Sequence, residues 1–385
     1  MAVVGKKNEG FNILGAHIDS PRLDLKPNPI YEEEETAYFK THYYGGIKKY
    51  QWTTIPLAIH GVVFTTDGKC HEIVVGEKDE DPIFYITDLL PHLADEQMKK
   101  SPRDFISGED LNVVIGGMPL KTSKKEEKDA FKANILKFLF DNYGIKEKDF
   151  VSAEIEIVPA THARDVGFDR AYIAAYGHDD KVCAYPALRA LLAQEKPKKT
   201  CVCLLTDKEE IGSYSNSGAT SNLYENFLME VFAKAEGGID KFNTLKFRKA
   251  LAATKMLSTD VTTAYDPKYA SVFEKNNTAF MSHGLKIEKY TGARGKSGCS
   301  EANGDFIAEI TDIFEKNSIP WQTGELGKID AGGGGTIAAV MAELGMDVVD
   351  MGVPVWSMHA PIEVISKIDL YFLYLGYKAF IENIK

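Results

Sequence analysis

The sequence predicts an α/β protein with a mostly parallel central sheet flanked by helices and with a β-rich domain inserted into it. From Asp179 onward, short apolar runs alternate with segments of helical periodicity, which is typical of a parallel sheet covered by helices. Residues 55–175 interrupt this pattern with strand-like segments and turn signals. We therefore expect one domain from residues 1–54 and 176–385, and an inserted domain at 55–175.

The first expected strand is the apolar segment Phe11–His17. In the insert, Leu57–Val75 has the pattern of a hairpin with Asp67-Gly68 at its turn. Alternation of apolar residues with glutamates over 153–157 predicts a half-buried antiparallel strand. Apolar residues at helical spacing predict a helix over 126–143, and the charged tract 121–128 is a solvated loop or the start of that helix.

The remaining chain predicts alternating elements. We expect strands at 201–206, 255–260, 320–325 and 347–352, and helices at 184–195, 219–236, 300–316, 336–344 and 367–383. Pro186 fits the first turn of its helix, and Ser366 is a candidate N-cap of the last one.

Composition excludes several classes of protein. The net charge is -11 with no basic stripe, which argues against a nucleic-acid groove or an anionic membrane face. No apolar run reaches the length of a membrane span, and the first residues lack the apolar core of a signal peptide. The five cysteines have no zinc-finger spacing; we expect thiols in a reducing compartment, and hence a cytoplasmic protein.

The most informative feature is the adjacent pair Glu209 and Glu210, just beyond the apolar run at 201–205. Ligands of open α/β sheets gather beyond the carboxyl ends of strands. One carboxylate there can bind a metal while its neighbour takes a proton from water. A solvated charge pair would look the same in isolation.

Other polar residues follow strand-like runs in the same way. They are His17, Asp19, Asp179, Asp180, Asp260 and His359. Each has a structural interpretation: a hydrogen-bonded histidine, an acidic helix cap, a strand-end turn or a loop histidine. Together they form a mixed nitrogen and oxygen set that suits Zn²⁺, Mn²⁺ or Co²⁺ better than Ca²⁺, and they predict a two-metal hydrolase.

At this point the sequence resembles a known family. Five motifs carry the resemblance: Gly15–Pro21, Asp207–Gly212, Ser357–His359, Tyr44–Gly46 and Gly334–Ile337. They look like those of the aspartyl aminopeptidase / vacuolar aminopeptidase I family of dinuclear zinc peptidases, over nearly the whole chain. The resemblance implies an α/β peptidase domain with an inserted dimerisation domain, assembled into tetrahedral homododecamers that act on peptides.

The resemblance also implies residue roles. His17, Asp179 and Asp260 would bind one metal ion, and Asp179, Glu210 and His359 the other, with Asp179 bridging. Glu209 would be the general base, and Asp19 would support His17. The ions would be two divalent metals, Zn²⁺ first, with Mn²⁺ or Co²⁺ as alternatives.

Substrate contacts are expected from Gly335, Thr336 and Lys289. A glycine run before a helix can approach a substrate backbone or cradle a phosphate, but it lacks the lysine of a P-loop. Lys289, with Lys286 and Arg294, is a candidate cation for an acidic substrate, or else a surface charge.

The chain departs from the family pattern at three points. The family usually has some tens of residues before the first metal motif, whereas sixteen residues precede His17 here; the expectation is a chain that is truncated or whose numbering starts late. The aspartyl branch has histidines where this chain has Thr263 and Glu96. Because both changes remove cations near the substrate, they leave the preferred N-terminal residue open.

Two other functions share these motifs. A carboxypeptidase or deacylase could use the same metal core, and would differ in which end of the substrate it recognises. The third hypothesis is a non-catalytic assembled shell or cargo-binding protein. The presence of every motif residue, including Glu209, argues against it.

Overall fold

The computed structural model describes residues 1–121 and 129–385, which divide into two compact units. Unit 1 comprises Met1–Ser20, Ala163–Met358 and Glu363–Lys385, and unit 2 comprises Pro21–His162 and His359–Ile362. The second unit therefore starts at Pro21 and not at residue 55, because the strands that follow Pro21 pair with the strands of the insert. Residues 163–175, expected to lie in the insert, belong to unit 1.

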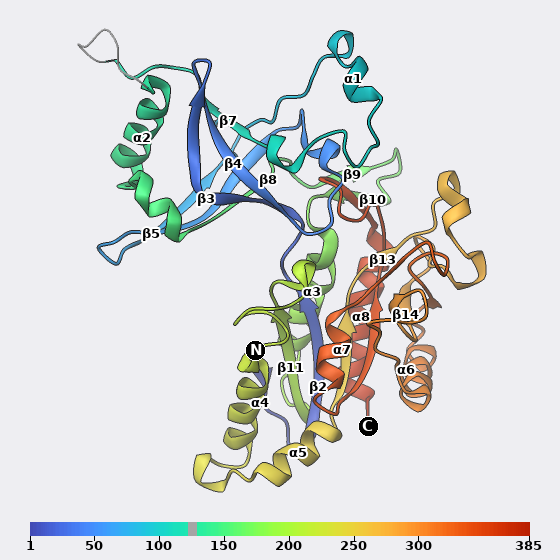
Figure 1. Cartoon of the computed structure of the whole chain (residues 1–385). Coiled ribbons are helices and arrows are strands. Elements are labelled where there is room, and N and C mark those ends of the chain that lie inside the picture. The colour runs from blue at the N-terminus through green and yellow to red at the C-terminus, as the bar shows by residue number, and fades with distance from the viewer. Residues whose placement is uncertain (122–128) are drawn as a thin grey trace. The chain divides into compact units, whose positions relative to one another are not determined.

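A seven-stranded sheet forms the centre of unit 1 (Figure 1). Its strands, in spatial order, are β1 (Ala2–Val3), β11 (Lys199–Thr206), β2 (Lys7–His17), β12 (Lys255–Thr259), β18 (Asp347–Gly352), β14 (Leu285–Glu288) and β16 (Trp321–Thr323). The four strands from β11 to β18 are parallel. The sheet as a whole is mixed, because β1 and β14 each pair antiparallel with their inner neighbour. Strand β14 is not among the strands expected from the sequence.

The inner strands are buried on both faces, which explains their nearly continuous apolar sequence. Alternate residues of each strand enter opposite cores: Leu14 joins one cluster of buried side chains and Ile13 the other. The first core is covered by α3 (His178–Leu192), α6 (Gly304–Lys316) and α8 (Lys367–Asn383). The second is covered by α4 (Asn222–Ala235), α5 (Thr244–Ala252) and α7 (Ile337–Ala342).

Most expected helices and strands of unit 1 are present with shifted ends. Helix α3 starts at His178, six residues before the predicted start, and α6 starts at Gly304. Helix α5 was not expected. Ser366 occupies the N-cap position of α8, but its hydroxyl does not cap the helix, because it lies 2.9 Å from the Ser282 hydroxyl instead.

A five-stranded sheet also belongs to unit 1. Its order is β13 (Thr262–Thr263), β19 (Pro354–Trp356), β20 (Glu363–Ser366), β10 (Tyr172–Ala175) and β9 (Arg164–Val166). Strand β10 ends just before α3 and β13 begins two residues after Asp260, so this sheet adjoins two of the segments that carry candidate ligands. The short pair β15 (Gly292–Ala293) and β17 (Gly333–Gly334) holds the glycine run.

Unit 2 is built on a six-stranded sheet in which every pairing is antiparallel. Its order is β6 (Cys70–Val75), β5 (Leu57–Phe64), β8 (Ala153–Pro159), β3 (Arg22–Glu33), β4 (Thr36–Tyr44) and β7 (Val113–Gly116). The hairpin β5–β6 and the strand β8 confirm the sequence predictions. Helix α2 runs over Ala130–Tyr143, whereas the start expected at 126 and most of the tract 121–128 lie outside the described residues.

All five cysteines are free thiols. Across residues 1–121 and 129–385, none of the helices combines the length and the apolar character that a membrane crossing requires.

Candidate metal centre

The centre of the site is His17, the last residue of β2. Its ring is almost fully buried, and its Nε2 atom lies 3.1 Å from Oδ1 of Asp179 and 3.7 Å from Oδ1 of Asp260. The parallel strands β2 and β12 are neighbours and end at the same edge of the sheet, so His17 and Asp260 meet there. Burial opposes a charged imidazolium, but the three carboxylates of Asp179, Asp19 and Asp260 raise the pKa of His17 well above its ordinary value.

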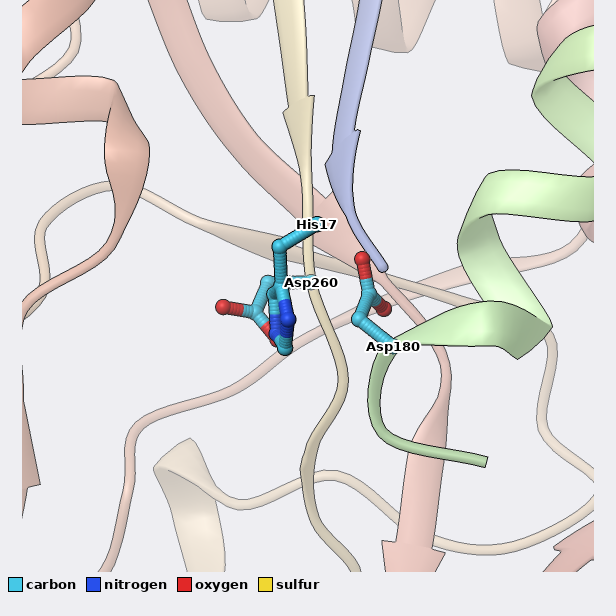
Figure 2. Close-up of side chains that lie close together, drawn as sticks. All are labelled: His17, Asp180 and Asp260. Atoms are coloured by element: carbon cyan, nitrogen blue, oxygen red, sulfur yellow. The ribbon is translucent and has the colours of Figure 1, made fainter. Parts of the chain in front are cut away.

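Two groups of potential ligands share His17. One consists of His17, Asp180 and Asp260, and the other of His17, Asp179 and Glu210; within each group, one ligand atom per residue lies within 4.8 Å of the others. Figure 2 shows the first group, with His17 at the end of β2, Asp260 just after β12, and Asp180 at the start of α3. The structure therefore brings four of the five predicted ligands together in unit 1.

Asp180 is a candidate residue for which the sequence predicts no ligand role. It is fully buried, neither carboxylate oxygen has a partner at hydrogen-bond geometry among the described residues 1–121 and 129–385, and the neighbouring Cys183 thiol is a weak donor. Burial, with Asp260 adding, raises its pKa well above the ordinary value. A buried carboxylate with no stronger donor than a thiol is costly unless a cation compensates its charge, so this set of ligand atoms fits a divalent ion.

The acidic pair at the start of α3 is held from two sides. The backbone N–H of Asp179 donates to Oε2 of Glu363 at 3.0 Å, and the Ser20 hydroxyl donates to the Asp179 carbonyl oxygen at 2.6 Å. Both residues depart from helical backbone angles although they lie within α3. Two adjacent carboxylates therefore enter two different ligand groups.

Asp19 fixes the position of the Glu209-Glu210 pair. Its Oδ1 atom accepts the backbone N–H of Glu209 and its Oδ2 atom that of Glu210, each at 3.1 Å. The same Oδ1 atom lies 3.3 Å from Nδ1 of His17. One buried carboxylate thus joins the end of β2 to the loop after β11, which is a wider role than support of His17 alone.

Glu209 lies in a short 3₁₀ turn, Glu209–Ile211, that starts after the left-handed residue Lys208. Burial, with Asp260 adding, raises the pKa of Glu209 to about 8. A cation in the ligand groups would oppose this shift, because it stabilises the nearby carboxylates. Glu209 belongs to neither of the two ligand groups found among the described residues.

His359 belongs to unit 2 by its contacts. Its Nδ1 atom lies 2.9 Å from the carbonyl oxygen of Gly46, and its ring is partly exposed. It is the one predicted ligand outside the two groups of unit 1.

The expected substrate contacts have different surroundings. The Thr336 hydroxyl donates to Oδ1 of Asp350 at 2.6 Å and accepts the Ala338 N–H, so it caps α7. Gly335 and Lys289 are exposed. Lys286 is fully buried and pairs with Glu288 at 2.8 Å, so it offers no charge to a substrate.

Known proteins resemble this chain over nearly its whole length. The family model described as "Aminopeptidase I zinc metalloprotease (M18)" matches residues 2–381. A probable M18 family aminopeptidase 1 from Clostridium acetobutylicum is 52% identical over 385 residues, which cover 100% of this chain and 82% of the relative. Its counterpart from Thermotoga maritima is 48% identical over 382 residues, covering 99% and 83%.

Solved structures resemble the chain in the same way. The crystal structure of the Thermotoga maritima M18 aminopeptidase has a TM-score of 0.93 at 47% identity, covering 98% of this chain and 82% of that one. That of aminopeptidase I from Clostridium acetobutylicum has a TM-score of 0.93 at 50% identity, covering 99% and 82%. The chain is a metal-dependent aminopeptidase and belongs to the M18 family of aminopeptidase I zinc metalloproteases.

Proposed function

We propose that this aminopeptidase removes N-terminal residues from peptides with two divalent ions, most simply Zn²⁺, and with Glu209 as general base. The observation that carries the proposal is the pair of ligand groups that share His17 at one sheet edge. When bound, two such ions polarise the scissile carbonyl, lower the pKa of water and stabilise the oxyanion. Mn²⁺ or Co²⁺ would satisfy the same mixed donors.

The ligand assignment follows the resemblance, with one addition. His17, Asp179 and Asp260 would hold one ion, and Asp179, Glu210 and His359 would hold the other, so that Asp179 would serve both. The addition is Asp180, which lies with His17 and Asp260 and either binds the first ion or compensates its charge from close by. The proximity of Asp179 Oδ1 to His17 Nε2, 3.1 Å, supports a position for Asp179 at the centre of the site.

Glu209 receives the proton of the attacking water on its carboxylate and returns it to the leaving amine. Its position beside Glu210, on a turn whose two N–H groups are held by Asp19, supports this role. The glycine run is proposed to contact the substrate through Gly335. Lys289 is proposed to contact it through its exposed ammonium group. Thr336 acts there by fixing the start of α7, since its hydroxyl is engaged by Asp350.

We further propose a homododecamer of tetrahedral symmetry, built from dimers that pair through unit 2. Support comes from the family resemblance and from a structure described as the S. cerevesiae mApe1 dodecamer, which matches this chain with a TM-score of 0.76. The five free thiols support a reducing, cytoplasmic location.

A substrate panel tests the reaction. The metal-loaded protein is expected to cleave aminoacyl-p-nitroanilides and unblocked peptides, and to leave N-acetylated peptides intact. Cleavage of N-blocked peptides from the carboxyl end would favour the carboxypeptidase or deacylase alternative. A fully loaded protein inactive on all substrates would favour the non-catalytic shell. A set of aminoacyl groups with acidic, neutral and basic side chains would define the preferred N-terminal residue.

A further inference from the structure

A contact within unit 2 defines the tautomer of the His359 imidazole ring. Its Nδ1 atom lies 2.9 Å from the Gly46 carbonyl oxygen, and a carbonyl oxygen can only accept a hydrogen bond. Nδ1 therefore carries the ring hydrogen. In the neutral imidazole the lone pair then lies on Nε2, which is the form in which histidine binds a metal.

The backbone around His359 is also specified. Ser357 and His359 both have left-handed φ angles, 60° and 64°, a region that residues other than glycine seldom occupy. Such a conformation persists only where the surroundings impose it, and it is found often at functional sites. This second observation, independent of the hydrogen bond, indicates that the direction of the His359 side chain is imposed.

Gly46 permits the close approach of the imidazole ring. A Cβ atom at position 46 would lie 3.3 Å from Nδ1 of His359 and 3.7 Å from Cε1, so a larger residue would displace the ring by a few tenths of an ångström. Gly46 itself is not in the left-handed region, so alanine can adopt its backbone conformation. The need for glycine here is therefore contact with the histidine.

An anchored strand end holds the Gly46 carbonyl. Strand β4 ends at Tyr44, which lies opposite Arg22 of β3, and the left-handed Gly45 turns the chain toward Gly46. The Arg22 guanidinium stacks 3.9 Å from the centre of the Tyr44 ring. Arg22 is almost fully buried and pairs with two carboxylates, Asp24 at 2.7 Å and Glu156 at 3.0 Å.

We propose that Gly46, held by the Arg22–Tyr44 stack, is a positioning residue that fixes the tautomer and direction of His359 for metal binding. The inference rests on the proposed function, in which His359 is a ligand of one of the two ions. It assigns unit 2 a task beyond assembly: affinity for that ion depends on the strand pair β3–β4.

The test measures metal affinity, not turnover. Metal-free Gly46→Ala is titrated with Zn²⁺ in competition with a chromophoric chelator. We expect one ion to bind about 10- to 100-fold more weakly, as for other groups that orient a ligand, and the other ion to bind as in the wild type. The unfolding temperature of the metal-free protein stays unchanged. Gly117→Ala is the matched control, because its added Cβ meets nothing within 4 Å.

His359→Ala separates the inference from the function on which it rests. We expect this variant to lose the same ion that Gly46→Ala weakens. If His359→Ala loses one ion while Gly46→Ala binds both normally, the positioning role is overturned and the ligand assignment stands. If His359→Ala binds two ions as tightly as the wild type, both the positioning role of Gly46 and the assignment of His359 as a ligand are wrong.

A second variant covers a folding defect. If Gly46→Ala lowers the unfolding temperature of the metal-free protein, Tyr44→Leu replaces it, since it removes the stacked ring and leaves position 46 intact. The same selective weakening is expected. The proposal is contradicted if the affinity for both ions falls equally, or if the affinity for neither ion falls.

Discussion

The Oδ1 atom of Asp19 accepts the backbone N–H of Glu209 at 3.1 Å. Because the other oxygen holds Glu210 in the same way, a single carboxylate sets the position of the proposed base and of a proposed ligand. Asp19→Asn replaces one acceptor oxygen with an NH₂ group that faces a backbone N–H. We expect metal affinity to fall about 10- to 100-fold, with a loss of kcat at saturating metal.

Metal titration and steady-state kinetics on one preparation measure both effects. Asp312→Asn, on the exposed face of α6, is the control and should match the wild type. An Asp19→Asn protein with unchanged affinity and kcat would show that Asp19 has no such role.

Glu209→Gln should retain both ions and lose turnover. The amide cannot take a proton from water, and loss of a general base costs about 10²- to 10⁴-fold in rate. Metal analysis and kcat are compared with those of Glu230→Gln, an exposed residue of α4. A variant with near wild-type kcat would remove Glu209 from the mechanism.

The two adjacent aspartates should behave differently. If Asp179 bridges, Asp179→Asn lowers the affinity for both ions. Asp180→Asn then lowers the affinity only for the ion bound near His17 and Asp260. Stepwise Zn²⁺ titration of both variants distinguishes them. The reverse result, with Asp180→Asn weakening both ions, would make Asp180 the bridging ligand.

Asp350 predicts a pH dependence of stability. Burial raises its pKa to about 7, so the folded protein holds a proton that the unfolded chain releases near the ordinary value. The stability that this proton contributes is present at low pH and is lost as pH rises through about 7.

Asp350→Asn should therefore flatten this dependence. The amide oxygen can still accept the hydroxyls of Thr336 and Ser258, and its side chain does not ionise. The free energy of unfolding of the metal-free protein is measured between pH 5 and 8. In the wild type, the contribution of Asp350 is expected to fall by on the order of 1–3 kcal/mol across this range. Parallel curves for variant and wild type would contradict the pKa.

Assembly has a defined mass because closed point groups fix the number of subunits. Light scattering on the purified protein should give twelve times 42.7 kDa. A monomer that degrades folded proteins as readily as short peptides would contradict both the dodecamer and its proposed restriction of access.

Much of unit 1 could be predicted because its strands are buried on both faces and read as continuous apolar runs. The ends of β2, β11 and β12 then located His17, Glu209 and Asp260. Strand β14 could not be recognised in this way, since it contains Lys286 and Glu288, whose charges compensate each other inside the protein. The sequence pattern of an isolated charged segment does not reveal such a pair.

The boundary of unit 2 was missed for a different reason. Strand β3 contains Pro27 and Pro29 and a register shift between Leu25 and Ile30, so its alternation is interrupted. The sequence marks Asp180 as a candidate but does not give it a role as a metal ligand, because two adjacent carboxylates have equivalent sequence contexts. Only the backbone geometry at the start of α3 directs them into different ligand groups.

The central claim is that two ions held by these residues are required for aminopeptidase activity. Metal-free protein should be titrated with Zn²⁺ while hydrolysis of a neutral aminoacyl-p-nitroanilide is followed at each addition. We predict that full activity is reached at two equivalents per chain, and that His359→Ala stops short of it. Full activity at one equivalent, with no further rise at the second, would contradict the account.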